Sequence, residues 1–176
     1  MPVQLGAHLG QQNLPISEIR ALWRRFDSAG LDWISIWDHF YEAPPAGGTQ
    51  PHFEAVSLLG ALAVETTRAR IGCLVFYPGY RNPASLAKAA TTLDHLSGGR
   101  FVLGLGGGWH AREHEAFGIP FGAGIGERLD RLDEAAGLLR RLLDGEVVTH
   151  HGRFYDLEAA VCAPRPVQAR LPLLVG

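Results

Sequence analysis

The pair Asp38-His39 is the first segment whose residue types could carry chemistry, because a histidine transfers a proton near neutral pH or hydrogen-bonds a cofactor ring. The pair follows directly after the apolar run at residues 33–37. Two interpretations are open from the residues alone. Either Asp38 caps the turn and His39 is a polar loop residue, or both take part in catalysis. Their place at the end of an expected strand favours a functional role.

A second candidate is the segment HAREH at residues 110–114, which matches the inverted zinc-protease pattern H-x-x-E-H. On a helix, His110 and His114 would share a face and could bind zinc, with Glu113 as the base. The third ligand would be an acidic residue from a later helix, and the sequence singles out neither of two candidates, Glu127 and Glu134. Short patterns often match by chance, so we expect a cluster of ion pairs at a helix start and no metal.

A glycine-rich turn, GLGGGW at residues 104–109, follows another apolar run. It resembles the dinucleotide fingerprint G-x-G-x-x-G, but Trp109 stands where the last glycine should be, which weakens that interpretation. Three successive glycines still allow close backbone approach to a flat ligand or a phosphate. We therefore expect Gly106, Gly107, Gly108 and Trp109 to border a ligand.

Composition limits the class of protein. The chain has 176 residues, of which 47% are apolar and 19% charged, and a formal net charge of -2. These values predict a globular domain with a core and no nucleic-acid partner. Cys73 and Cys162 fit no zinc spacing, so we expect a cytoplasmic protein. The N-terminus lacks the features of a signal peptide, and no apolar run is long enough to cross a membrane.

The candidate residues are positioned by an expected alternation of strands and helices. Amphipathic helices at about 17–30, 53–66, 84–96 and 126–143 separate short apolar runs, with Ser17 as a possible helix cap and Leu129 facing inward. Because the strands alternate with helices, the sequence predicts an α/β fold with a parallel sheet. The expected strands are residues 3–9, 33–37, 71–76, 101–106 and 171–175. An insertion at about 147–167 contains an expected hairpin turning at His151-Gly152.

The number of strands is too small for a closed barrel. A (β/α)₈ TIM barrel needs about 250 residues, whereas this sequence provides about the first five strands. Either the sequence is the N-terminal portion of a longer barrel domain, or it is a natural partial barrel with two unpaired strand edges. Unpaired edges promote aggregation, so we favour the first interpretation.

Several segments together resemble the luciferase-like monooxygenase family, in particular its branch that depends on the deazaflavin coenzyme F420. The most specific stretch runs from Ala69 to Phe121, because its strand, its N-P-x-x-L-A-K helix start and its G-G-R-x-x-L-G-x-G turn follow in the order of the family. The other segments are WISIWDHF and HHGRFYDLEAAVCAPRPVQARLPLLVG.

The resemblance implies roles for particular residues. Asp38 and His39 match the pair beside the reactive edge of the ring, and His39 is the candidate for moving a proton. Cys73, Leu74 and Val75 match a bulge that backs the ring, with a non-proline cis peptide expected between Cys73 and Leu74. Gly106, Gly107, Gly108 and Trp109 match the loop beside the ring. Some F420 dehydrogenases carry a catalytic glutamate where this chain has Trp109.

The resemblance also implies an activity: hydride transfer between F420 and a small organic substrate. One alternative is an FMN-dependent monooxygenase that uses reduced flavin and O₂. A third possibility is a non-catalytic partial barrel that binds flavin or forms dimers. The implied partners are a small-molecule substrate, a second copy in a homodimer, and a flavin or F420 reductase that supplies reduced cofactor.

Overall fold

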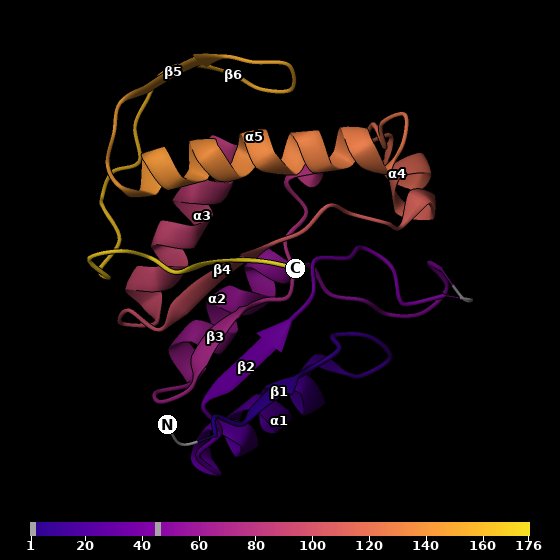
Figure 1. Cartoon of the computed structure of the whole chain (residues 1–176). Helices are drawn as coiled ribbons and strands as arrows, with labels where there is room; N and C mark the ends of the chain where they lie inside the picture. The colour runs from indigo at the N-terminus through magenta and orange to yellow at the C-terminus, as the bar shows by residue number, and fades with distance from the viewer. Residues whose placement is uncertain (1–2, 45–46) are drawn as a thin grey trace.

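The computed structural model describes residues 3–44 and 47–176, and it forms a parallel five-stranded sheet flanked by helices (Figure 1). The strands lie in the order β1-β2-β3-β4-β7, and all neighbours are parallel. Their bounds are β1 Gly6–His8, β2 Trp33–Ile36, β3 Arg70–Cys73, β4 Phe101–Leu105 and β7 Leu173–Val175. Each strand of the sheet lies beside the next one along the chain, as in a β/α barrel and unlike a doubly wound sheet, whose order reverses. The expected partial-barrel fold is confirmed.

The helices pack along the sheet in chain order, and the central strands β2, β3 and β4 are mostly buried. Their bounds are α1 Ile16–Ser28, α2 Ala55–Glu65, the short 3₁₀ helix η1 Pro78–Tyr80, α3 Pro83–Leu96, α4 Ala111–Phe117 and α5 Ile125–Leu143. In the central strands β2, β3 and β4, the side chains of Ile34, Ile71 and Phe101 are fully buried, whereas Val175 of the outer strand β7 is exposed. This burial explains why the strands are continuous apolar runs and do not alternate with polar residues.

Two details of the helices differ from expectation. Ser17 does not cap α1, because the helix begins at Ile16 and its N-cap is Pro15, which puts Ser17 within the first turn. Leu129 is 50% exposed and does not face inward, because the buried positions of α5 begin only at Leu132. The first turns of α5 extend beyond the helix it packs against, and Leu129 lies over the loop at Gly107 instead.

The insertion forms the expected antiparallel hairpin, β5 Val148–His151 and β6 Asp156–Ala160, which lies above α5 (Figure 1). Glu134 of α5 holds it by accepting hydrogen bonds from the Tyr155 backbone N–H at 3.0 Å and from His150 at 3.1 Å. Tyr155 in turn donates its hydroxyl to the carbonyl of Pro78 at 3.0 Å. The hairpin therefore fixes η1, the segment that follows β3.

Within the described ranges, no helix combines the length and the apolar character that crossing a bilayer requires.

Candidate functional site

The carboxyl ends of β2, β3 and β4 meet at one small hollow of about 130 Å³. In parallel strands these ends lie at the same edge of the sheet, which is where barrel enzymes place their sites. The hollow is lined by Asp38, His39, Leu74, Val75, Tyr77, Tyr80, Gly108 and Trp109. Six of the nine residues expected at the site are therefore brought together, and Tyr77 and Tyr80 join them.

Cys73, Gly106 and Gly107 were also expected at the ligand, and none of them lines the hollow. Cys73 is fully buried, and burial raises the pKa of its thiol well above the ordinary value. A Cβ on Gly106 would overlap the side chain of Val75. Gly106 thus allows the loop after β4 to approach the segment after β3, and it acts through packing.

The backbone after β3 is irregular, as the resemblance implied, but one residue later than expected. The non-proline cis peptide joins Leu74 to Val75 and does not join Cys73 to Leu74. The Leu74 N–H still donates to the carbonyl of Ile36 at 2.8 Å, so regular pairing with β2 continues through this residue. Leu74 and Val75, which flank the cis bond, are the two residues of this segment that line the hollow.

Asp38 is held in a buried ion pair. Its two carboxylate oxygens accept from Nη1 and Nη2 of Arg81 at 2.6 and 2.8 Å, and one oxygen also accepts from the backbone N–H of Tyr77 at 3.1 Å. Burial raises the pKa of the Asp38 carboxyl, and the guanidinium of Arg81 opposes that shift. Arg81 has no distinctive sequence signal, because its partner lies 43 residues away.

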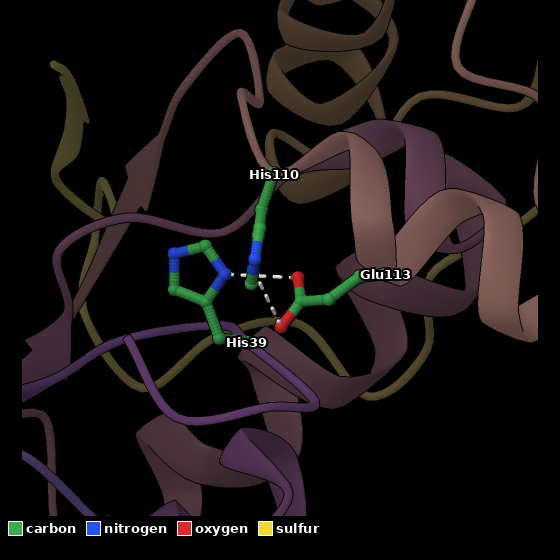
Figure 2. Close-up of side chains that lie close together, drawn as sticks. All are labelled: His39, His110 and Glu113. Atoms are coloured by element: carbon green, nitrogen blue, oxygen red, sulfur yellow. Dashed lines mark hydrogen bonds and ion pairs between the residues drawn. The ribbon is translucent and has the colours of Figure 1, made fainter. Parts of the chain in front are cut away.

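His39 is hydrogen-bonded to Glu113, a residue that the sequence indicated only as part of the H-x-x-E-H pattern. Its Nδ1 lies 2.9 Å from Oε2 of Glu113, which comes from α4 (Figure 2). The same oxygen accepts the hydroxyl of Tyr80 at 2.5 Å, while Oε1 accepts the backbone N–H groups of Phe40 and Tyr41 at 2.7 and 2.8 Å. Glu113 was expected only as part of the H-x-x-E-H pattern; its actual partner, His39, is 74 residues away.

The zinc arrangement suggested by H-x-x-E-H does not form. His114 turns to the carbonyl of Ile119, with its Nδ1 at 3.2 Å. Among the described residues, the one cluster with metal-ligand types is His39, His110 and Glu113, whose candidate atoms lie within 4.8 Å of one another. A carboxylate has about four lone-pair sites. Those of Glu113 already accept N–H and O–H donors, so the cluster is a hydrogen-bond centre.

Trp109 forms the rim of the hollow. The residue is 58% exposed, its ring stacks on His110 with centroids 4.8 Å apart, and it lies in a T-shaped arrangement with the His39 ring, with centroids 5.3 Å apart. The exposed indole therefore gives a flat, largely apolar surface beside the imidazole.

The walls of the hollow fit a planar heteroaromatic ring. Gly108, which lines the hollow, has a φ of 70°, and a Cβ there would come within 2.8 Å of the Tyr77 ring, so glycine lets the backbone pack against that ring. The Tyr77 hydroxyl is buried and finds no hydrogen-bond partner among residues 3–44 and 47–176. The lining thus combines polar side chains with apolar and aromatic ones, a mixture that can both pack against a cofactor ring and hydrogen-bond its edge.

Known proteins share this fold and part of this sequence. The family model for luciferase-like monooxygenases matches residues 1–176. An F420-dependent glucose-6-phosphate dehydrogenase from Kineococcus radiotolerans is 34% identical over 176 residues, covering 99% of this chain and 51% of the relative. The chain thus spans about half the length of the curated relatives it matches.

Two solved structures show the same fold with different cofactors. An F420-dependent secondary alcohol dehydrogenase, in complex with an F420-acetone adduct, aligns with a TM-score of 0.87 at 23% identity over 99% of this chain and 52% of its own. The oxygenating constituent of 3,6-diketocamphane monooxygenase from Pseudomonas putida, in complex with FMN, aligns with a TM-score of 0.77 at 19% identity over 99% and 51%. Because the family model covers the whole chain and a curated relative agrees over nearly all of it, this chain belongs to the luciferase-like monooxygenase family.

Proposed function

We propose that this chain provides the ring-binding and proton-transfer part of an F420-dependent oxidoreductase that acts on a small organic substrate. The observation that carries the proposal is the position of His39. Its imidazole lines the hollow with 20% of the side chain exposed, and its Nδ1 edge is bound to Glu113. Figure 2 shows the Nε2 edge turned away from that carboxylate.

The relatives support the choice of cofactor. The relative from Kineococcus radiotolerans is named as F420-dependent and is 34% identical over nearly the whole chain. The FMN-bound monooxygenase is 19% identical to this chain, and a similarity at that level supports the shared fold alone. An FMN-dependent monooxygenase supplied by a partner reductase is therefore the second candidate.

A bound deazaflavin would supply hydride acceptance and donation at its ring. Oxidation of an alcohol carbon releases a hydride and a hydroxyl proton, so the chain must provide a place for the proton. His39 takes that proton at Nε2 in the oxidative direction and returns it in the reverse direction. Leu74, Val75 and Gly108 would hold the ring, and Trp109 would border it at the rim of the hollow.

We further propose that this chain is the N-terminal portion of a barrel whose remaining strands complete the site. Relatives of about twice the length have room for those strands. The outer strands in the described part, β1 and β7, would pair with them, which removes the open edges. A homodimer, proposed from the resemblance to the family, would be tested by light scattering.

The experiment is a pair of titrations with purified oxidised F420 and FMN, followed by quenching of tryptophan fluorescence, in which Trp109 is the exposed reporter. Tighter binding of F420, followed by loss of its absorbance when a panel of alcohols and sugar phosphates is added without oxygen, is the expected result. Trp109→Phe controls for the source of the signal. Tighter binding of FMN with oxygen-dependent product formation would establish the monooxygenase instead. Cofactor binding without turnover of any kind, measured with the remaining barrel strands present, would leave a binding protein and overturn the proposal.

A further inference from the structure

Glu113 is completely buried, although it lies on the seven-residue helix α4 beside an open hollow. A buried carboxylate is costly unless hydrogen bonds satisfy it. Glu113 accepts hydrogen bonds from four groups. The side-chain donors are His39 and Tyr80, and the Nδ1 of His110 lies 3.3 Å from Oε1 without a hydrogen bond. The backbone donors are the N–H groups of Phe40 and Tyr41.

The two backbone donors determine the role of each carboxylate oxygen of Glu113. The backbone N–H groups of Phe40 and Tyr41 can only donate, so the oxygen they meet, Oε1, must accept. Oε2 is left for Tyr80 and His39. The loop that carries His39 is therefore bound to the same carboxylate as the His39 ring, which sets both the position of the backbone and the angle of the imidazole.

Glu113 stays ionised at neutral pH. Burial alone would raise the pKa of its carboxyl, but the hydrogen bonds from His39, Tyr80 and the Tyr41 backbone outweigh burial and lower the pKa to about 2. An ionised carboxylate only accepts hydrogen bonds, so the His39 nitrogen facing it must carry the hydrogen.

We propose that Glu113 is a positioning residue that holds His39 as the Nδ1–H tautomer and leaves the Nε2 lone pair for a proton in the hollow. The inference rests on the proposed function, because it assigns Glu113 to the histidine that moves the proton there. The chemical relation is that of a carboxylate that orients a catalytic imidazole. Glu113 does not line the hollow itself, so it acts through the lining side chains bound to it, His39 and Tyr80.

The decisive variant is Glu113→Gln, which preserves shape and removes the charge. The two backbone donors keep the amide oxygen at the Oε1 position, so the amide NH₂ takes the Oε2 position. A donor then faces His39 Nδ1, which must become an acceptor, and the ring hydrogen moves to Nε2. The variant therefore reverses the tautomer in a predictable direction.

The tautomer is read directly by ¹⁵N NMR of imidazole-labelled protein, with the His39 signal assigned by its loss in His39→Gln. Wild type should show a protonated Nδ1, and Glu113→Gln a protonated Nε2. The kcat for substrate oxidation should fall about 10²-fold or more, as expected when a general base presents the wrong nitrogen. KM and cofactor affinity should change less than about threefold, a split that a merely structural role would not produce.

Two control variants separate the effect from general damage. Tyr80→Phe removes the other donor to Oε2 and should leave His39 protonated at Nδ1. Glu115→Gln makes the same chemical change two residues away on α4, at a side chain that is 77% exposed, and should change neither the tautomer nor kcat.

A protonated Nε2 in the wild-type protein would overturn the proposal, and this measurement needs no variant and therefore does not depend on whether Glu113→Gln folds. An unchanged tautomer in a folded Glu113→Gln would also overturn it. Absence of turnover in the wild type, with the expected tautomers, would instead contradict the proposed function while the relation between Glu113 and His39 stands.

Discussion

The guanidinium of Arg81 meets the carboxylate of Asp38 through two parallel hydrogen bonds, Nη1 to Oδ2 at 2.6 Å and Nη2 to Oδ1 at 2.8 Å. Asp38 follows β2, and Arg81 follows the 3₁₀ helix after β3. The pair therefore ties the loop that carries His39 to the segment that follows Leu74 and Val75. Both carboxylate oxygens are occupied, which favours a supporting role for Asp38 and leaves proton transfer to His39.

Replacing Asp38 by asparagine should lower the free energy of unfolding by about 3 kcal/mol, because it removes the buried counter-charge of Arg81 and leaves only the half-exposed Glu54, 3.7 Å from the guanidinium. Urea denaturation followed by circular dichroism measures the loss. Asp156→Asn is the matched control, since Asp156 pairs with His151 on the surface and should cost less than about 1 kcal/mol. Equal losses in the two variants would show that the Asp38 pair contributes little.

Replacing His39 by alanine should reduce the rate of hydride transfer by about 10²- to 10⁴-fold and cofactor affinity much less. The reason is that the imidazole provides the proton site, while Leu74, Val75 and Gly108 provide the surface for the ring. Single-turnover absorbance gives the rate, and fluorescence titration gives the affinity. Equal losses of both would make His39 a binding or structural residue.

Replacing Gly108 by alanine should reduce the free energy of cofactor binding more than it reduces the free energy of unfolding. Gly108 and Gly118 have nearly the same left-handed backbone, with φ of 70° and 65°, so alanine costs similar strain at both. Only at Gly108 does the new Cβ meet a neighbour, the Tyr77 ring at 2.8 Å, whereas the space at Gly118 is open. Titration of both variants with F420 should show weaker binding for Gly108→Ala alone.

His52 should make stability depend on pH below neutrality. Burial lowers the pKa of His52 from 6.5 to about 4, and its Nε2 accepts the indole N–H of Trp37 at 2.7 Å. The unfolded chain therefore binds a proton at His52 between pH 6.5 and 4 while the folded chain does not, so the free energy of unfolding should fall as the pH is lowered through this window.

The check is the urea midpoint at several pH values for wild type and His52→Gln, whose side-chain oxygen can still accept from Trp37. The slope between pH 6.5 and 4 should become shallower in the variant. His151→Gln alters a histidine whose side chain is 68% exposed and should leave the slope as it is. A wild-type slope that His52→Gln does not change would rule out His52 as its source.

The sequence by itself determined the sheet strands, the four longer helices and the edge of the sheet where the site lies, although the short helices η1 and α4 were not among the expected elements. Short apolar runs such as residues 101–106 and helical periodicity are local signals, and glycine turns mark where strands end. In a parallel sheet these ends must share one edge, so Asp38, His39, Gly108 and Trp109 could be assigned to one site before any coordinates were known.

Only the tertiary structure decided which side chains pair within that site. Arg81 reaches Asp38 over 43 residues, and Glu113 reaches His39 over 74. No periodicity encodes such partners, because they depend on how the loops after different strands turn toward one another. The H-x-x-E-H pattern identified Glu113 but assigned it to neighbouring histidines for the same reason: a local motif cannot show that the partner comes from another strand.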